Sequence, residues 1–337
     1  MSKSKLFEQM DVLISKGMSS VAASQQVAKQ NKVSIKPESL RIAYFRQKRK
    51  TVKKAVSKTI KAKPTNAFSG ILEKLKPNPN PLGLPESKEN AFAPFKLDKS
   101  VRKILFLSDI HVPYHNIEAL TVALKHGLEE GCDTVYLNGD VIDFYAISSF
   151  DKDPRKRNFG EEVMKTREFL SLLRGLFPKA HIYYKCGNHD VRYERYLMKC
   201  APDLFGLGEY NLETLLHLEQ NNIIFIPDKQ IVHAGKLTMI HGHELGKTIM
   251  SPVNVARGLY LRTKESSICG HSHQTSQHVE KSVNGKVTSC WSVGCLCELH
   301  PDYAPINKYN HGFAIIDIFE NGDFEVFNHT IVNGKIR

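Results

Sequence analysis

The sequence predicts an α/β protein with a small all-helical module at its amino-terminal end. Three short apolar runs, at residues 104–107, 134–137 and 182–184, alternate with helical stretches near residues 117–130 and 161–176. Strands and helices that alternate at this spacing indicate parallel crossover units. Before these runs, the first fifty residues show apolar residues at helical spacing instead.

Three short helices are expected in that first segment. The first has its apolar residues on one face and ends at Gly17. A serine, Ser19 or Ser20, can cap a second helix over roughly residues 21–30. Pro37 suits the first turn of a third helix, because its missing N–H group would have no helical partner there.

The third helix is basic on its outer side. Leu40 and Tyr44 face inward at helical spacing, which leaves three arginines outside, Arg41, Arg46 and Arg49. Three small helices of which the last is basic resemble a helix-turn-helix module, so these arginines are expected to contact nucleic acid. Many small helical domains share the pattern, and recruitment of a protein partner stays open.

Positive charge is concentrated in the first hundred residues. They hold 21 Lys and Arg against 7 Asp and Glu, whereas the rest of the chain holds 26 against 28, within a total net charge of +12. A localised basic segment attracts polyanions, and nucleic acid is the first candidate. The alternative is a solubilising segment that binds nothing specific.

A linker separates the basic module from the α/β part. Residues 64–100 contain the Pro- and Asn-rich stretch KPNPNPLGLPESKEN, whose composition opposes regular structure. The expected organisation is therefore a helical module at 1–63, a linker at 64–100 and a catalytic domain at 101–337.

Composition also narrows the cellular setting. The sequence has no apolar run of about 18 residues, so no membrane association is expected, and the charged start does not resemble a secretory signal. Seven scattered Cys without a CxxC pair fit a reducing compartment, which leads us to expect a cytoplasmic protein. Cys295 and Cys297 are interpreted as small buried residues in preference to a soft metal site.

Five apolar runs are each followed at once by a polar motif. The first three runs end in SDIH, NGDVID and GNHD, and two later runs, at 237–240 and 267–269, end in HGH and GHSH. A closing hairpin is expected around Asn321-Gly322. Because residues just past the carboxyl ends of parallel strands converge on one crevice, seven side chains are expected to meet: Asp109, His111, Asp140, Asn188, His241, His271 and His273.

The types of these side chains favour a pair of metal ions. Carboxylates together with imidazoles suit Mn, Fe or Zn, and the absence of Cys from the motifs argues against a structural zinc site. Two ions held about 3.5–4 Å apart can grip both the attacking and the leaving oxygen of a phosphoryl displacement. Asp140 is the candidate for a bridging carboxylate.

Three neighbours of these ligands have candidate roles in the same reaction. His189 is the candidate catalytic residue beside Asp140, because it could donate a proton to the leaving oxygen or stabilise the developing charge. Asp143 and Asp190 are expected to orient imidazoles or backbone groups from behind.

The five motifs in this order resemble the signature blocks of the calcineurin-like metallophosphoesterases. The resemblance spans roughly residues 101–330, and it implies a sandwich of two β-sheets flanked by helices. By that resemblance Asp109, His111, Asp140 and His273 hold one divalent metal ion. The second ion is held by Asp140, Asn188, His241 and His271, with a bridging water or hydroxide as nucleophile. Mn is the first expectation for the metal, with Fe, Zn or Ni as alternatives.

The substrate is expected to be a phosphodiester. In the resembled family, GNHD is frequent among phosphodiesterases and nucleases, whereas GNHE is frequent among phosphoprotein phosphatases. Together with the basic module, this favours a DNA phosphodiesterase or nuclease. Arg155 and Arg157, on a basic loop, and Arg192, just after the third motif, could grip phosphate oxygens; the loop could equally be a solvated surface.

Two other functions stay open. The chain could be a phosphomonoesterase for a protein or a small molecule, recruited by its helical module. It could also be a nucleic-acid-binding factor whose metal site is residual. The choice between DNA and RNA, endonuclease or exonuclease action and the oligomeric state are left open by the sequence.

Overall fold

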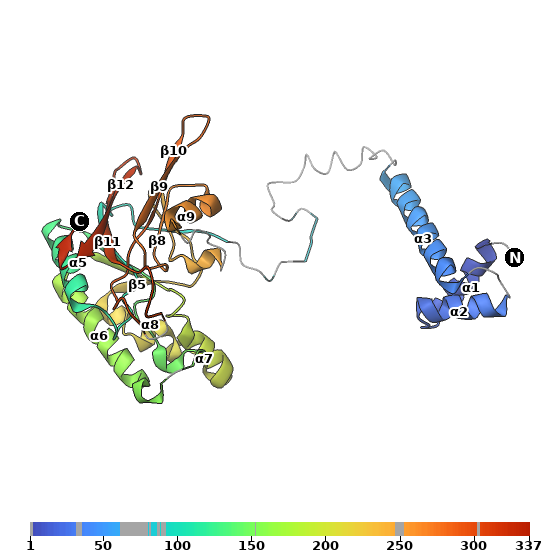
Figure 1. The fold of residues 1–337 in the computed structure, drawn as a ribbon, viewed down its shortest axis with the longest axis horizontal. Coiled ribbons are helices and arrows are strands. Elements are labelled where there is room, and N and C mark those ends of the chain that lie inside the picture. The colour runs from blue at the N-terminus through green and yellow to red at the C-terminus, as the bar shows by residue number, and fades with distance from the viewer. Residues whose placement is uncertain are drawn as a thin grey trace. The chain divides into compact units, whose positions relative to one another are not determined.

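The computed structural model describes residues 3–31, 36–60, 80, 82–85, 88, 92–151, 153–246, 253–301 and 304–337. The chain divides into two compact units, Met1–Asn90 and Ala91–Arg337. Each unit has its own secondary structure, helical in the first and mixed in the second (Figure 1).

The first unit contains the three predicted helices. They are α1 (Lys3–Ser15), α2 (Ser20–Gln30) and α3 (Pro37–Ile60). Ser19 caps α2, because its side chain accepts a hydrogen bond from the N–H of Ala22 at 3.3 Å. The apolar faces of the three helices meet in a small core of Leu6, Phe7, Met10, Val27, Ala28, Leu40 and Tyr44.

The larger sheet of the second unit has seven strands in the order β13-β12-β11-β2-β3-β4-β5. Four of them run parallel, namely β2 (Lys103–Leu107), β3 (Thr134–Asn138), β4 (His181–Lys185) and β5 (Ile223–Ile226). Three antiparallel strands complete it, namely β11 (His311–Ile318), β12 (Phe324–Val332) and β13 (Lys335–Ile336). The predicted parallel crossovers and the hairpin at Gly322 are both confirmed.

A second sheet has six strands in the order β1-β6-β7-β8-β10-β9. They are β1 (Phe95–Lys96), β6 (Val232–Ala234), β7 (Leu237–Met239), β8 (Ser267–Cys269), β9 (Ser276–Lys281) and β10 (Val287–Ser292). Its strands β7 and β8 are parallel to each other. The two sheets with flanking helices confirm the expected sandwich.

Strand β1 corrects the predicted linker. Phe95 and Lys96 pair in parallel with Val232 and His233 of β6, and Leu97 is buried. These residues lie in the range 64–100 that composition assigned to the linker. Two residues of strand have no periodicity of their own, so only the pairing with a distant strand reveals them.

Helices cover the seven-stranded sheet. They are α5 (Ile117–Glu129), α6 (Phe159–Leu176), α7 (Arg192–Cys200) and α8 (Leu212–Leu215), and α9 (Val255–Thr263) contacts β8, β9 and β10 of the other sheet. Short 3₁₀ turns lie at Tyr145–Ile147, Pro154–Lys156, Pro202–Leu204, Gly208–Tyr210, Glu219–Asn221 and His243–Leu245. Among the described residues, no helix combines the length and apolar character that crossing a membrane requires.

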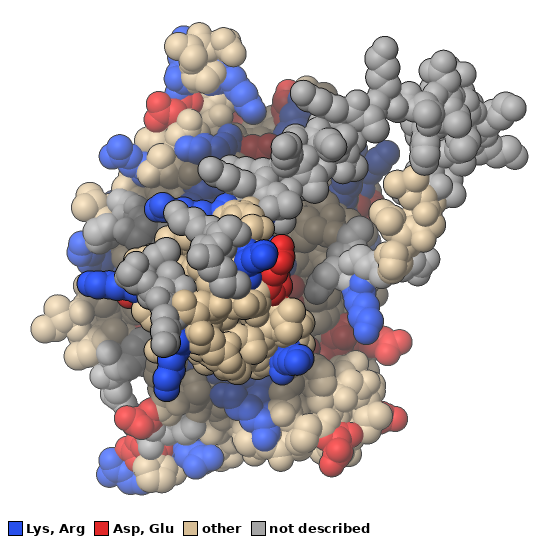
Figure 2. Space-filling model, turned by 90° about the vertical axis from the view of Figure 1, so that its right-hand side faces the viewer, with Lys and Arg blue, Asp and Glu red and all other residues tan. Residues whose placement is uncertain are grey.

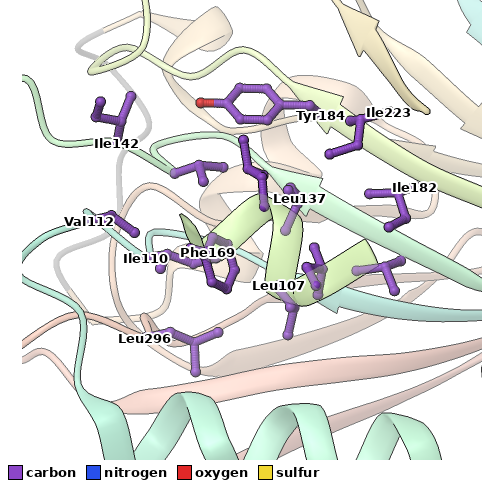
Figure 3. Packing of buried hydrophobic residues seen from close by; sticks show 14 of the residues in the cluster. Leu107, Ile110, Val112, Leu137, Ile142, Phe169, Ile182, Tyr184, Ile223 and Leu296 are labelled. Carbon is purple, nitrogen blue, oxygen red and sulfur yellow. The ribbon is translucent and has the colours of Figure 1, made fainter. Parts of the chain in front are cut away.

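The strands of the larger sheet bury both faces. Leu105 and Leu107 of β2 belong to the core shared with α5 and α6, whereas Ile104 and Phe106 belong to the core shared with the second sheet. This alternation follows the two-residue period of a strand. Figure 3 shows Leu107 and Leu137 of neighbouring strands in the first core, with Phe169 of α6 among them. The strands are therefore clamped, and the loops that follow them have fixed starting points.

Candidate metal centre

The polar motifs lie at the carboxyl ends of strands from both sheets. Asp109 lies two residues after the end of β2, and Asp140 lies two residues after the end of β3. In the other sheet, His241 lies two residues after β7, and His271 lies two residues after β8. Asn188 follows β4 by three residues. Because the strands within each set are parallel, their ends lie at a common edge, and the distances below show that the two edges meet.

Five of these side chains stand on unusual backbone. Positive φ angles between 52° and 64° occur at Asp109, His111, Asp140, His271 and His273. A non-glycine residue in this left-handed region costs about 1–3 kcal/mol and persists only where the surroundings enforce it. Non-glycine residues with positive φ also occur elsewhere in the described chain, for example at Phe144 and Asn333, but five of the seven predicted ligands share this backbone conformation. Such strain is frequent at functional sites.

One group of candidate ligands gathers around Asp109. His273 Nε2 lies 3.2 Å from Asp109 Oδ1, and His111 Nε2 lies 4.0 Å from the same oxygen and 3.9 Å from Asp140 Oδ2. Among the described side chains, Asp109 Oδ1 and His111 Nε2 are buried atoms without a hydrogen-bond partner. Buried polar atoms are normally paired. A cation between these atoms would satisfy them, so the donor set fits a divalent metal ion.

A second group gathers on the other side of Asp140. Asp140 Oδ2 lies 3.3 Å from His241 Nε2, which in turn lies 3.1 Å from Asn188 Oδ1. His271 completes this group, because one ligand atom each of Asp140, His241 and His271 lies within 4.8 Å of the others. Asp140 also forms such a group with His111 and His189. The structure thus brings together all seven predicted ligand candidates, with Asp140 between the two groups.

The pKa values in the cluster reflect crowded carboxylates and imidazoles. Burial acts to raise the pKa of Asp140, but His241 and His189 lower it well below its ordinary value. Burial acts to lower the pKa of His241, but the Asp140 carboxylate raises it to about 10. Burial and the neighbouring His241 lower the pKa of His271 to about 4.

Asp143 and Asp190 support the cluster from behind. Asp143 Oδ1 lies 2.9 Å from His111 Nδ1 and 3.0 Å from His189 Nδ1, so one carboxylate orients both rings. Asp190 accepts the backbone N–H groups of Asp140 and Gly187, each at 2.7 Å, and the hydroxyl of Tyr184 at 2.6 Å. Asp143 thus contacts two imidazoles, and Asp190 contacts backbone groups of the motifs.

Glycines of the motifs leave room for these side chains. A Cβ atom at Gly187 would lie 2.4 Å from Asp140 Oδ1, and one at Gly139 would lie 2.5 Å from His241 Nδ1. Both distances are shorter than a Cβ atom tolerates. The glycine in GNHD and the glycine in NGDVID are therefore steric requirements of the cluster.

His189 lies beside Asp140 and is held in one orientation. Its backbone N–H donates to Asp140 Oδ1 at 2.7 Å, and its Nε2 lies 3.9 Å from Asp140 Oδ2. Arg192 reaches the same place, because Nη2 donates to His189 Nε2 at 3.0 Å and Nη1 donates to the backbone oxygen of Asp143 at 2.8 Å. Of the three arginines expected to grip phosphate, Arg192 is the one with direct contacts to this cluster.

The other predicted arginines have different settings. Arg155 is exposed and makes a bidentate ion pair with Asp153, at distances of 2.7 to 3.1 Å, and Arg157 is exposed on the same loop. On α3, Arg41 lies 3.9 Å from Glu38 and Arg46 is exposed. The side chain of Arg49 lies outside the described residues.

Sequence reasoning missed a buried ion pair behind His241. Glu244 accepts the backbone N–H groups of His241 at 3.0 Å and Gly242 at 2.7 Å. Lys185, fully buried, lies 3.2 Å from the same carboxylate. A lysine inside an apolar strand was the available signal. His243 is also paired, with its Nε2 at 2.6 Å from Asp228 Oδ1.

Cys297 also contacts the cluster. Its sulfur lies 3.8 Å from Nδ1 of His273, on the side of the ring away from Asp109. Cys295 and Cys297 are both buried, as the sequence predicts.

Comparison with known proteins decides the family. The model of the calcineurin-like phosphoesterases matches residues 102–275, which include all five motifs. The chain belongs to the calcineurin-like phosphoesterase family. It is accordingly a metal-dependent phosphoesterase, and members of this family usually bind divalent metal ions. No curated protein sequence matches the chain.

Several solved structures are similar to this family member. A Vps29 single mutant from Entamoeba histolytica is 16% identical, with 70% of this chain and 96% of that one covered and a TM-score of 0.38. Vacuolar protein sorting 29 from Cryptosporidium parvum is 15% identical, with 70% and 95% covered and a TM-score of 0.40. Yfce, a phosphoesterase from E. coli, is 16% identical, with 67% and 98% covered and a TM-score of 0.31. The family assignment does not depend on these distant likenesses.

Proposed function

We propose that this phosphoesterase cleaves phosphodiester bonds of nucleic acid at a centre of two divalent metal ions. The observation that carries the two-ion part is the position of Asp140, whose carboxylate belongs to candidate ligand groups on both of its sides. A carboxylate shared in this way suits a bridge between two cations about 3.5–4 Å apart.

The donor set divides between the two ions. Asp109, His111, Asp140 and His273 would hold one ion, and Asp140, Asn188, His241 and His271 would hold the other. When bound, such ions polarise phosphoryl oxygens and lower the pKa of a coordinated water molecule. Mn is the first candidate for the metal. Fe, Zn and Ni are alternatives, because carboxylate and imidazole ligands together accept these ions as well.

His189 is proposed to protonate the leaving oxygen. Asp143 Oδ1 lies 3.0 Å from Nδ1 of His189, and this carboxylate would stabilise the protonated imidazole. Nε2 of His189 accepts a hydrogen bond from Arg192 here. For Nε2 to carry the proton, the guanidinium must turn away, and a phosphate oxygen is the partner it would take. Arg192 is therefore proposed to bind the substrate phosphate.

Three observations support nucleic acid as the substrate. The third motif reads GNHD, and the first hundred residues hold the whole excess of positive charge. Arg46 is exposed on α3, and Arg41 is half-buried beside Glu38. On the face drawn in Figure 2, Lys and Arg side chains are interspersed with Asp and Glu side chains. The electrostatic support for a nucleic-acid substrate therefore comes from the charge along the sequence and from the arginines of α3. In this proposal α3 belongs to a helix-turn-helix-like module that would hold the substrate.

A substrate panel tests the proposal. The full chain with added Mn²⁺ is given single- and double-stranded DNA, RNA, cyclic nucleotides, a phosphopeptide, p-nitrophenyl phosphate and bis-p-nitrophenyl phosphate. We expect turnover of nucleic acid and of the diester to exceed that of the monoester and the phosphopeptide. The reverse order would make the chain a phosphomonoesterase. Turnover of none, with Mn²⁺ bound, would leave a binding factor with a residual centre.

A further inference from the structure

A small cavity opens directly beside the candidate metal centre. Its volume is ≈ 220 Å³, and its lining includes His111 and Asp143 of the cluster itself. Its other walls include Tyr114, Tyr145, His300 and Pro301. Whatever occupies this cavity is therefore next to a phosphate that lies on the centre.

We propose that this cavity is a subsite for one nucleobase of the substrate. The proposal rests on the proposed function, because it assigns the base to the nucleotide whose phosphate is cleaved. The subsite adds a requirement, namely that one base is unstacked from its neighbours and enters the cavity alone.

Two tyrosines supply the surface that a base would contact. The rings of Tyr114 and Tyr145 lie 6.1 Å apart with an angle of 71° between their planes. Tyr114 is 36% exposed, so its ring is open to a ligand. Aromatic side chains bind bases of any sequence, because every base has a flat π-face.

The side chain of Tyr145 and the backbone of both tyrosines are held in place without a ligand. The Tyr145 hydroxyl accepts a hydrogen bond from the backbone N–H of Asp153 at 2.7 Å. The backbone N–H of Tyr145 donates to the Glu162 carboxylate at 2.9 Å. The backbone of Tyr114 bonds on both sides, to His111 at 2.6 Å and to Glu298 at 2.9 Å. A base that enters would therefore meet the fixed ring of Tyr145 and a ring of Tyr114 that stands on fixed backbone, which limits the entropy lost on binding.

The size of the cavity restricts its occupant. Pockets for drug-sized ligands measure about 300–1,000 Å³. A cavity of ≈ 220 Å³ is smaller than these pockets, so it accommodates a single base and not a base pair. A base inside a duplex cannot reach such a pocket unless it is extruded. Single-stranded nucleic acid, an end or an extruded nucleotide is therefore the class of substrate that fits.

The polar groups of the lining favour a base over a plain phenyl ring. Glu298 and His300 contribute a carboxylate and an imidazole beside the tyrosines. His300 Nδ1 lies 3.0 Å from the backbone oxygen of Pro305, which fixes the orientation of that ring. Glu298 Oε1 accepts a hydrogen bond from Asn116 at 3.0 Å, which holds the carboxylate in place. The edges of a nucleobase can form further hydrogen bonds with these groups, whereas a phenyl ring has no donor or acceptor to offer them.

Calorimetric binding tests the subsite. The full chain carrying His189→Ala, to slow turnover during the measurement, is loaded with Mn²⁺ and titrated with thymidine 5′-monophosphate, 2-deoxyribose 5-phosphate and phosphotyrosine. The first two ligands share phosphate and sugar and differ in the base. Stacking of one base on aromatic side chains corresponds to about 5- to 150-fold in affinity, so we expect the nucleotide to bind tighter than the sugar phosphate by a factor in this range.

Variants locate the effect. Tyr114→Leu should weaken the nucleotide and leave the sugar phosphate unchanged, while Tyr114→Phe should retain most of the difference. Tyr196→Leu, which removes a 42% exposed tyrosine on α7, is the matched control and should change neither. Equal affinity of the two ligands, an unchanged difference in Tyr114→Leu, or tighter binding of phosphotyrosine would each overturn the subsite.

The two proposals can fail separately. If the unsubstituted chain hydrolyses bis-p-nitrophenyl phosphate but the base adds no affinity, the subsite is wrong and the diesterase proposal stands. If the base adds affinity that Tyr114→Leu removes but no ester is hydrolysed, the subsite stands and the proposed hydrolysis is wrong.

Discussion

Asp140 lies among three imidazoles of the cluster. Its Oδ2 lies 3.3 Å from His241 and 3.9 Å from both His111 and His189, and its Oδ1 accepts the backbone N–H of His189. Its position couples the two candidate ligand groups to the candidate proton donor. Substitutions at Asp140 and at His189 should therefore have separable effects.

Asp140→Asn is expected to strip metal from the protein. The amide keeps the shape of the side chain but lacks the negative charge that both cations would share. The loss of affinity should exceed the about 10–100-fold that follows removal of an outer-shell partner. Elemental analysis after dialysis against low Mn²⁺ measures the occupancy, with the exposed Asp203→Asn as the control. Full retention of metal by Asp140→Asn would contradict a bridging role.

His189→Ala is expected to behave differently. The ring is proposed as a proton donor and not as a ligand, so metal occupancy should be kept. Turnover should fall by roughly 10²–10⁴, the usual contribution of a general acid. Occupancy and kcat are measured on the same preparation. A variant that loses its metal, or that turns over at the rate of the unsubstituted chain, would show that this role is misassigned.

At the scale of elements, Glu162 joins α6 to the 3₁₀ turn that carries Tyr145. Its carboxylate accepts the backbone N–H groups of Tyr145 and Ala146, each at 2.9 Å, and the residue is 2% exposed. Burial raises the pKa of Glu162 from 4.5 to about 7. The folded state therefore holds a proton over a pH range in which the unfolded chain has released it.

The stability of the second unit should consequently depend on pH through Glu162. Relative to Glu162→Gln, the unsubstituted chain should lose stability as the pH rises from about 4.5 to about 7. In this range the unfolded chain releases the proton of Glu162 readily, whereas the folded chain retains it, so rising pH favours the unfolded state. Urea unfolding followed by the fluorescence of Trp291, the one tryptophan of the chain, reports on this unit. A difference between the two proteins that stays constant over this pH range would refute the shift.

Helix α3 carries the electrostatic part of the proposed nucleic-acid binding. Replacing Arg41 and Arg46 with Gln should weaken binding of duplex DNA and reduce the slope of log K against log salt by about two, one unit for each lost phosphate contact. The matched control replaces two other exposed lysines with Gln, Lys5 on α1 and Lys16 in the turn just after it. Equal slopes for both double variants would mean that α3 does not contact the phosphates.

At the scale of the whole molecule, the metal ions should hold together strands from both sheets. The candidate ligands follow β2, β3 and β4 of one sheet and β7 and β8 of the other. Binding to the folded state alone raises its stability as the free metal concentration rises above the dissociation constant. Bound cations would also offset the repulsion between the buried carboxylates of Asp109 and Asp140.

Chelation should therefore lower both activity and stability. Treatment with EDTA is expected to abolish turnover and to move the urea midpoint of Trp291 fluorescence to lower urea, and added Mn²⁺ should restore both. The helical unit has no tryptophan, so its unfolding does not enter this signal. An unchanged midpoint together with full activity in EDTA would argue against a metal-dependent centre.

The centre was predictable because its signals are local. A short apolar run indicates each of these strands, and each motif follows within a few residues of the strand end, as at Asp109 and His241. The types of donor atom are also written in the sequence. Neither prediction needs knowledge of how the sheets pack, so the α/β class, the parallel crossovers and the seven ligand candidates could be derived from the amino acids alone.

Other features depend on pairings between distant residues. Strand β1 exists because Phe95 meets Val232, and the ion pair behind His241 exists because Lys185 meets Glu244. The cavity beside the centre is built from residues that range from His111 to Pro301 along the chain. The local sequence determined the strands that precede the motifs, the motifs themselves and the kinds of ligand. Only tertiary packing decided how close the ligand candidates of the two sheets lie and what surrounds them, because distances between segments far apart in the chain have no local signature.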